Sequence, residues 1–319
     1  MNNKIIVIVG PTAVGKTYVS VELAKKLNTE IISADSMQIY RGMDVGTAKI
    51  TEEEKQGIKH HMIDLVNPDE DYSVSDFKRD AEEIIDRLLI EGKIPIVVGG
   101  SGLYINSLIY DLDFGKAKSD EKIRKYYYSY YKEHGEDALY EKLLKIDPES
   151  AKKIHKNNVK RVIRALEVFH LTGKKFSQLS TNIRKGSSKY NCIIIGLSME
   201  RELLYEKINE RVDEMLSQGL VEEVSNLLEK GYSKNLVSMR GIGYKEIVEY
   251  LEGTMDFEEA VNILKRNTRR FAKRQYTWFL KDKNIKWFSM DNLDEIDKTL
   301  NRIYKYICST IQGGRDEHY

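Results

Sequence analysis

Runs of aliphatic residues alternate with helical patterns in the first third of the chain. Residues 5–9, 30–35 and 94–98 are short and rich in β-branched residues, which is typical of buried strands. Residues 18–27 and 73–89 repeat apolar positions every three or four residues, as amphipathic helices do. Continuous apolar strands separated by helices are typical of a parallel sheet covered on both faces, so we predict an α/β fold.

The pattern changes after Phe114. Residues 119–176 have helical periodicity, and no strand-like run follows until residues 192–197. From there the pattern is almost wholly helical to the C-terminus, and residues 311–319 predict a disordered tail. The predicted domains are a catalytic core of residues 1–112 and 190–319 and a helical insertion of residues 113–189.

A glycine-rich loop separates the first strand from the first helix. It fits the phosphate-loop pattern G-x-x-x-x-G-K-[ST] at every required position. Its glycines let backbone N–H groups point at phosphate oxygens, and the helix N-terminus adds partial positive charge. Lys16 adds a full charge, and the Thr17 hydroxyl is placed to bind Mg²⁺. We predict a P-loop NTPase-like parallel sheet flanked by helices that binds a di- or triphosphate; the alternative is a plain glycine-rich turn. The loop consists of Gly10, Pro11, Thr12, Ala13, Val14, Gly15, Lys16 and Thr17.

Asp35 follows the second predicted strand. Ligands of an open parallel sheet bind outside the carboxyl ends of its strands, where the phosphate loop and Asp35 would both emerge. Asp35 is therefore a candidate site residue, although an Asp here also suits a turn or a helix cap. A hydrolysing ATPase usually carries an Asp after a strand such as residues 94–98, whereas this strand is followed by Gly99. That difference favours a group transferase.

His60 and His61 begin a third strand-like stretch, residues 60–66. Adjacent residues of a strand point to opposite faces, so the two imidazoles would not share a metal ion. We expect structural histidines with hydrogen-bond partners.

The charges balance over the whole chain but not within it. The 319 residues contain 51 Lys+Arg and 50 Asp+Glu, a net charge of +1. Residues 113–190 alone hold 19 basic and 10 acidic residues. The rest of the chain therefore holds 32 basic and 40 acidic residues. Residues 265–274 hold six basic residues and no acid, and Tyr276 and Trp278 follow. Both regions are candidate nucleic-acid surfaces, because a locally basic segment is expected where a protein meets a polyanion.

Two further segments place basic residues in a defined local structure. Residues 157–173 predict a helix with Arg161 and Arg164 on one face, a pair that equally suits a solvated surface. In residues 240–245, a glycine turn is flanked by basic residues. Tyrosines cluster at residues 126–131, where they either pack between helices or stack on bases.

No sequence feature indicates secretion or membrane insertion. The apolar run 5–9 is too short for a signal peptide, and no run reaches membrane-spanning length. Cys192 and Cys308 lie far apart, so neither a disulfide framework nor a zinc site is indicated. We expect a soluble, cytoplasmic protein that acts as a monomer.

Five segments resemble the tRNA dimethylallyltransferase family. The match runs over nearly the whole chain, and its Asp-Ser-Met-Gln sequence is far more selective than the phosphate loop. The resemblance implies transfer of a dimethylallyl group from its diphosphate to the exocyclic amine of the adenosine 3′-adjacent to the anticodon. The implied partners are dimethylallyl diphosphate and the tRNA anticodon stem-loop, with Mg²⁺ as cofactor. The segments are residues 10–17, 33–41, 99–104, 161–167 and 240–244.

The resemblance and the chemistry together assign roles to these residues. Asp35 would accept the proton of the attacking amine, general-base help worth about two to four powers of ten in rate. Lys16, and Mg²⁺ bound by Thr17, would neutralise the leaving diphosphate. The amide of Gln38 would bind an adenine edge, and the basic insertion would grip a tRNA whose base is turned out of its stack. The residues implied to contact tRNA are Asp35, Ser36, Met37, Gln38, Ser101, Arg124, Lys160, Arg161, Val162, Ile163, Arg164, Arg240, Gly241, Ile242, Gly243, Tyr244 and Lys245.

Two of these positions depart from the family pattern. Ser101 stands where members often have Thr, a change that keeps the hydroxyl. Lys160 stands where many have Gln, which exchanges an amide for a charge. Arg124 rests on the least distinctive flanking sequence.

Two other functions are compatible with a phosphate loop. In a small-molecule kinase, Arg161 and Arg164 would belong to a lid over ATP, but the size and charge of the insertion argue against it. No adenine pocket is identifiable in the sequence either. An RNA-binding protein that uses the loop as a nucleotide-dependent switch is disfavoured by the missing strand-end Asp.

Overall fold

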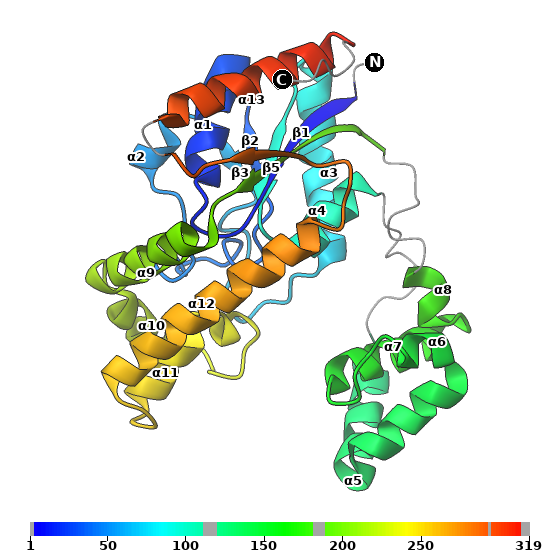
Figure 1. Ribbon diagram of the computed structural model, residues 1–319. Helices are drawn as coiled ribbons and strands as arrows, with labels where there is room; N and C mark the ends of the chain where they lie inside the picture. The colour runs from blue at the N-terminus through cyan, green and yellow to red at the C-terminus, as the bar shows by residue number, and fades with distance from the viewer. Residues whose placement is uncertain (1–2, 111–119, 181–188, 293–294, 314–319) are drawn as a thin grey trace. The chain divides into compact units, whose positions relative to one another are not determined.

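The computed structural model describes residues 3–110, 120–180, 189–292 and 295–313 (Figure 1). The chain divides into two compact units. The core unit consists of Met1–Ile109 and Tyr190–Tyr319, and the insertion unit consists of Tyr110–Lys189. The predicted boundary between residues 112 and 113 lies outside the described residues, and the functions assigned to the two predicted domains stay predictions.

The described part of the core unit contains one parallel sheet with the strand order β3-β2-β4-β1-β5-β6. Strand β1 lies inside the sheet, where Ile6 pairs with Ile96 of β4 and with Ile193 of β5. Both faces of β1 are buried, which explains its continuous apolar sequence. The strands are β1 (Lys4–Val9), β2 (Ile31–Ser33), β3 (His60–His61), β4 (Ile96–Gly99), β5 (Asn191–Ser198) and β6 (Lys286–Ser289).

Helices flank this sheet (Figure 1). A capping box begins α3, the helix predicted over residues 73–89: the Ser73 hydroxyl accepts a hydrogen bond from the Asp76 N–H, and the Asp76 carboxylate accepts one from the Ser73 N–H. The predicted α/β class with a helix-flanked parallel sheet is confirmed. The core-unit helices are α1 (Lys16–Leu27), α2 (Glu52–Lys55), α3 (Val74–Ile90), α4 (Gly102–Ile109), α9 (Arg201–Ser217), α10 (Leu220–Glu229), α11 (Tyr244–Leu251), α12 (Phe257–Phe279) and α13 (Ile296–Ile311), with the 3₁₀ helix η1 (Ser238–Arg240).

The core unit contains two hydrophobic clusters. One joins the sheet to helices such as α1 and α13, for example through Ile8, Val19 and Ile303. The other joins the loop after β2 to helices α10, α11 and α12, with Met43 and Tyr244 among its fully buried members. The second cluster therefore fixes the chain that leaves the carboxyl end of β2.

Three predictions about this unit need correction or comment. The region after β5 is not wholly helical, because Lys286–Ser289 forms β6 beside β5. This strand has only four residues and two of them are exposed, so its sequence carries no strong alternation. Strand β3 is confined to His60–His61, because Met62 and Asp64 have φ angles of 65° and 56° and turn the backbone. The disordered tail is expected over residues 311–319, but residue 311 is the last residue of α13. Residues 314–319 lie outside the described part of the chain.

Both histidines of β3 have hydrogen-bond partners, as expected for structural histidines. A ring nitrogen of His61 lies 2.6 Å from the Glu30 carboxylate, and a ring nitrogen of His60 lies 2.9 Å from the Ile58 carbonyl. Burial lowers the pKa of both imidazoles.

The insertion unit is helical, as predicted. Its helices are α5 (Glu121–Ile146), α6 (Pro148–Ala151), α7 (Val159–Thr172) and α8 (Phe176–Ser180). Helix α5 is broken at Gly135, which has a φ of 80°. The predicted helix of residues 157–173 is α7, whose N-cap Asn158 accepts a hydrogen bond from the Arg161 N–H. Tyr127 belongs to the unit's core and Tyr126 is 56% exposed, so the tyrosine cluster is divided between packing and surface.

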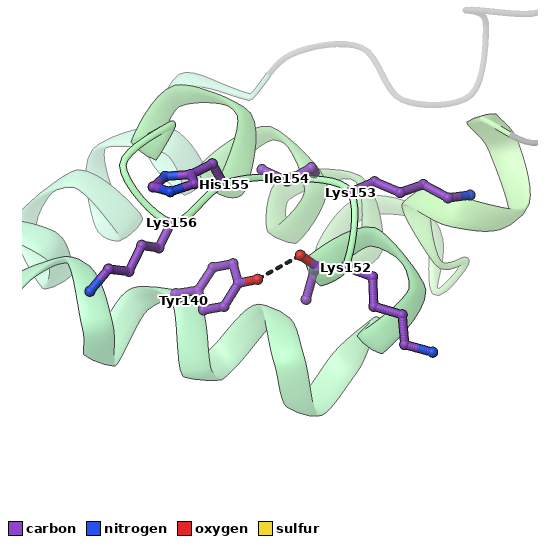
Figure 2. A pocket seen from close by; sticks show the side chains of 7 residues that line it. Tyr140, Lys152, Lys153, Ile154, His155 and Lys156 are labelled. Carbon is purple, nitrogen blue, oxygen red and sulfur yellow. Dashed lines mark hydrogen bonds between the residues drawn. The ribbon is translucent and has the colours of Figure 1, made fainter.

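A hollow of about 430 Å³ lies on the insertion unit (Figure 2). Its wall includes Tyr140, whose hydroxyl donates a 2.5 Å hydrogen bond to the Ala151 carbonyl. Lys152 and Lys156 also line it, and both pair with exposed carboxylates of Glu149 and Asp137. The hollow lies in a different unit from the phosphate loop.

Candidate active site

The phosphate loop connects β1 to α1 in a conformation that suits an anion. Gly10 and Gly15 have φ angles of 154° and 91°, which glycine adopts without strain. A Cβ at Gly10 would also lie 2.6 Å from the Leu197 carbonyl oxygen of β5. No side chain caps the N-terminus of α1, and its first turn contains no acidic residue. The first N–H groups of α1 and its dipole are therefore available to a phosphate.

Lys16 folds back over this loop. Its ammonium donates hydrogen bonds to the carbonyls of Gly10 (3.1 Å) and Pro11 (2.6 Å). Burial, and the like charge of Arg211, lower the pKa of Lys16 to about 7, while the Asp35 carboxylate opposes that shift. A bound diphosphate that replaced these carbonyls would place negative charge beside the ammonium and would raise the pKa of Lys16.

Arg211 is a member of this site that the sequence analysis missed. It lies on α9, and its guanidinium is 3.5 Å from the Thr12 hydroxyl of the phosphate loop. Burial lowers its pKa, whereas the Asp35 carboxylate raises it. The structure records no ion pair within 4 Å for this guanidinium among the described residues. Arg211 and Lys16 thus place two basic side chains beside the loop, and the charge of Asp35 raises the pKa of both.

Asp35 lies two residues beyond the end of β2 at Ser33. Its Oδ1 accepts a 2.9 Å hydrogen bond from the Met37 N–H, so it does satisfy a turn. Its charge also raises the pKa of Lys16 and Arg211, so the carboxylate lies within electrostatic range of both side chains. The two interpretations of Asp35 are therefore compatible, and its catalytic role stays a prediction.

The carboxyl ends of β2 and β4 are joined by two serines. The Ser101 hydroxyl accepts a 3.0 Å hydrogen bond from the Ser36 N–H and lies 3.2 Å from the Ser36 hydroxyl. A Cβ at Gly99 would lie 2.2 Å from the Ala34 carbonyl oxygen. The segments that follow β2 and β4 approach so closely here that an Asp side chain, as in a hydrolysing ATPase, would not fit at residue 99.

The amide of Gln38 is engaged within its own loop. Its Oε1 accepts a hydrogen bond from the Ser33 hydroxyl at 3.1 Å, and its Nε2 donates to the carbonyls of Thr47 and Ala48. An adenine contact by Gln38 therefore requires exchange of these hydrogen bonds. The predicted recognition of the base by Gln38 remains untested.

Residues 240–245 lie beside the loop after β2. A Cβ at Gly241 would be 2.5 Å from the Met37 methyl carbon, so these two predicted tRNA-contacting segments touch. Arg240 is exposed, and Ile242 and Lys245 are partly exposed. The Tyr244 ring is fully buried, which leaves no exposed side-chain surface of that residue for an RNA contact. Gly243, with a φ of 98°, is the N-cap of α11.

Helix α12 contributes a second missed residue, Gln275. Its Oε1 accepts a hydrogen bond from the Thr12 N–H at 2.9 Å, and its Nε2 donates to the Gly100 carbonyl at 3.1 Å. One buried amide therefore joins the phosphate loop to the loop after β4. The adjacent face of α12 is basic and exposed at Arg266, Arg270, Lys273 and Arg274, so the predicted nucleic-acid surface is physically available.

The insertion-unit candidates differ from one another in exposure. Lys160 and Arg161 are exposed, whereas Val162 and Ile163 have buried side chains. Arg164 donates to the fully buried carboxylate of Glu167 at 2.7 Å, and Arg124 donates to the same carboxylate at 2.9 Å. The predicted face of α7 is therefore divided between exposed cations, buried apolar residues and an internally paired arginine.

Thr17 is the residue predicted to bind Mg²⁺. It is exposed at the N-terminus of α1, and no hydrogen bond of its hydroxyl is found within the described part of the chain. Within that same part, no group of three or more His, Cys, Asp or Glu side chains is arranged to hold a metal ion. The described helices also include none with the length and apolar character needed to cross a membrane.

The sheet order, the phosphate loop and the carboxylate beyond β2 define the P-loop-like class of α/β proteins. A family model described as IPP transferase matches residues 38–282. Over 305 residues the chain is 53% identical to the tRNA dimethylallyltransferase of Alkaliphilus oremlandii, covering 96% of this chain and 97% of the relative. The chain therefore belongs to the IPP transferase family, and the family predicted from the sequence is confirmed.

Solved structures agree with this assignment. The full-length tRNA isopentenylpyrophosphate transferase from Bacillus halodurans aligns with a TM-score of 0.75 at 46% identity, covering 98% of both chains. A eukaryotic dimethylallyltransferase acting on tRNA aligns with a TM-score of 0.85 at 30% identity, covering 99% of this chain and 81% of that one. Similarity therefore extends over both units.

Proposed function

We propose that this protein transfers a dimethylallyl group from dimethylallyl diphosphate to the exocyclic amine of the adenosine 3′-adjacent to the anticodon in tRNA. The observation that carries the proposal is the position of Asp35, two residues beyond the end of β2, from where its charge raises the pKa of both Lys16 and Arg211. Leaving-group stabilisation and proton acceptance are thereby combined in one site. The names of the relatives support the same reaction.

The phosphate-loop side binds the diphosphate end of the donor. The N–H groups at the start of α1 face its oxygens, and Lys16 and Arg211 neutralise the charge that grows as the C–O bond breaks. Thr17 fits a Mg²⁺ ligand because its exposed hydroxyl lies at the same helix end. When bound, Mg²⁺ would supply further charge neutralisation to the diphosphate oxygens.

The Asp35 side receives the adenosine amine. The amine nitrogen forms a bond to the allylic carbon, the C–O bond to diphosphate breaks, and the Asp35 carboxylate accepts the proton released from nitrogen. The core-unit residues that we propose to hold the acceptor are Ser36, Met37, Gln38, Ser101, Arg240, Gly241, Ile242 and Lys245. In the insertion unit, exposed Lys160 and Arg161 are proposed to bind tRNA phosphates.

One incubation separates this reaction from its alternatives. Unmodified tRNA is incubated with the protein, Mg²⁺ and either dimethylallyl diphosphate labelled in the allyl group or ATP labelled in the γ-phosphate. The proposal requires the allyl label to appear on the adenosine 3′-adjacent to the anticodon and on no other nucleoside. Phosphate transfer from ATP to a small molecule would favour a kinase, and binding of RNA without any transfer would favour a switch protein.

We also propose Mg²⁺ as the cofactor and a cytoplasmic monomer as the functional form. Chelation of divalent ions in the same assay should stop transfer, and added Mg²⁺ should restore it. Thr17→Ala should raise the Mg²⁺ concentration needed for half-maximal transfer. Sedimentation equilibrium with and without tRNA tests the monomer, and cell fractionation tests the compartment.

A further inference from the structure

One carboxylate holds the loop that leaves β2. Glu223, in the first turn of α10, accepts backbone hydrogen bonds from three consecutive residues of that loop: Asp44 (2.7 Å), Val45 (2.7 Å) and Gly46 (3.0 Å). It also accepts a 2.7 Å hydrogen bond from the Tyr244 hydroxyl. Oε2 receives the first two of these hydrogen bonds, and Oε1 receives the other two.

These four donors are the recorded partners of Glu223 among the described residues, and none is a Lys or Arg side chain. Successive N–H groups that converge on one anion form a binding concavity for negative charge. Here a side chain of the protein occupies that concavity. Hydrogen bonds to a charged acceptor are about twice as strong as neutral ones, so the contact restrains the loop strongly.

The same contact joins two segments that we propose to hold the acceptor. The Tyr244 ring lies against the loop so closely that a Cβ at Gly46 would be 2.6 Å from it. At the other end of the loop, Met37 packs against Gly241. Residues 36–46 and residues 240–245 are therefore joined at two points, and Glu223 supplies the polar contacts at one of them.

We propose that Glu223 is a positioning residue for the acceptor: its carboxylate fixes the loop with Ser36, Met37 and Gln38 against residues 240–245. It touches neither the reacting atoms nor the phosphate loop. Its removal should therefore affect recognition of tRNA and leave recognition of the donor unchanged. This inference rests on the proposed transfer to tRNA.

The test is Glu223→Gln in a steady-state transfer assay. The amide keeps one acceptor oxygen but replaces the other with an N–H₂ group, so two of the four donors lose their acceptor. We expect KM for tRNA to rise about tenfold, equivalent to about 1.4 kcal/mol, with kcat and KM for dimethylallyl diphosphate changed less than about twofold. Glu222→Gln is the matched control, because it removes the same charge from an exposed neighbour in the same helical turn, and it should leave all three constants unchanged.

Tyr244→Phe provides an independent variant. It removes one donor and leaves the three backbone hydrogen bonds, so KM for tRNA should rise about threefold, again without a change in KM for the donor. In the double variant the two effects should be less than additive, because both act on the same carboxylate. If Glu223→Gln does not fold, Tyr244→Phe decides the proposal through the same comparison of constants.

Two results would overturn the proposal. One is an unchanged KM for tRNA in folded Glu223→Gln. The other is an equal rise of KM for both substrates together with a lower Tm, which would indicate a structural role alone. Failure of the proposed function is distinguishable, because the wild-type protein would then transfer no label in the first place.

Discussion

The phosphate-loop site and the contact between helices α5 and α7 each contain a pair of cations, but the two pairs are neutralised differently. Lys16 and Arg211 lie beside backbone carbonyls and a hydroxyl, and both have lowered pKa values. Arg124 and Arg164 instead share the buried carboxylate of Glu167. We therefore expect the phosphate-loop cations to receive an anionic ligand, and the cations paired with Glu167 to stabilise the fold.

This comparison separates residues that the sequence treats alike. Arg161 and Arg164 are three residues apart on one helix and look equivalent. Only Arg164 is paired with Glu167, which also accepts a hydrogen bond from the Asp120 N–H at the start of α5. Arg164 therefore contributes to the joining of α5 and α7, while exposed Arg161 is available to a phosphate.

The largest expected effect is at the Asp35 carboxylate. Asp35→Asn keeps the shape and the turn hydrogen bond but removes the proton acceptor. The single-turnover transfer rate should fall by at least about a hundredfold while tRNA and donor still bind. Asp71→Asn is the control, because it removes the same negative charge from an exposed residue. Near-normal turnover, or a rate loss explained wholly by lost binding, would falsify the general-base role.

In the insertion unit, the corresponding experiment removes the shared carboxylate. Glu167→Ala removes the buried carboxylate that accepts hydrogen bonds from Arg124, Arg164 and the Asp120 N–H, which should lower the free energy of unfolding by about 3 kcal/mol. Chemical denaturation measures it, with exposed Glu141→Ala as the control. A loss no larger than that of the control would mean that the buried pairing contributes little stability.

The lowered pKa of Lys16 predicts a pH dependence of donor binding. A bound diphosphate favours the charged ammonium, so binding takes up a proton whenever free Lys16 is neutral. Between pH 7 and the higher pKa of the ammonium in the complex, donor affinity should fall by up to about tenfold per pH unit. Calorimetric titration in buffers of different ionisation enthalpy measures this proton uptake. A flat profile between pH 7 and 9 would contradict the assignment.

The smallest expected effect concerns the exposed cation of α7. Arg161→Ala should reduce the slope of log K for tRNA against log salt concentration by roughly 0.7 to 0.9, since one phosphate contact is lost. Arg164→Ala should reduce it less, because its guanidinium is paired with Glu167. Filter binding over a series of salt concentrations measures both slopes, and equal slopes for the two variants would remove the distinction between them.

Parts of this site that are contiguous in sequence were predictable. Residues 10–17 form a complete local signature, and Asp35 follows a recognisable strand. Arg211, Gln275 and Glu223 lie on helices distant in the sequence, within ordinary amphipathic patterns. Their roles depend on which loop each helix packs against, and that is a tertiary property. Short β6 escaped prediction for a similar reason, since its pairing with β5 rather than its own pattern defines it.

The measurement that tests the account most directly compares one cation from each region in the same binding experiment. The affinity for dimethylallyl diphosphate is determined by calorimetry for Lys16→Ala and for Arg164→Ala, after circular dichroism has shown both to be folded. Loss of Lys16 should weaken donor binding by about tenfold or more and leave tRNA affinity nearly unchanged. Arg164→Ala should leave donor affinity within about twofold of the wild type. Unchanged donor binding in Lys16→Ala, or an equal loss in both variants, would contradict the claim that the cations without a carboxylate partner receive the diphosphate.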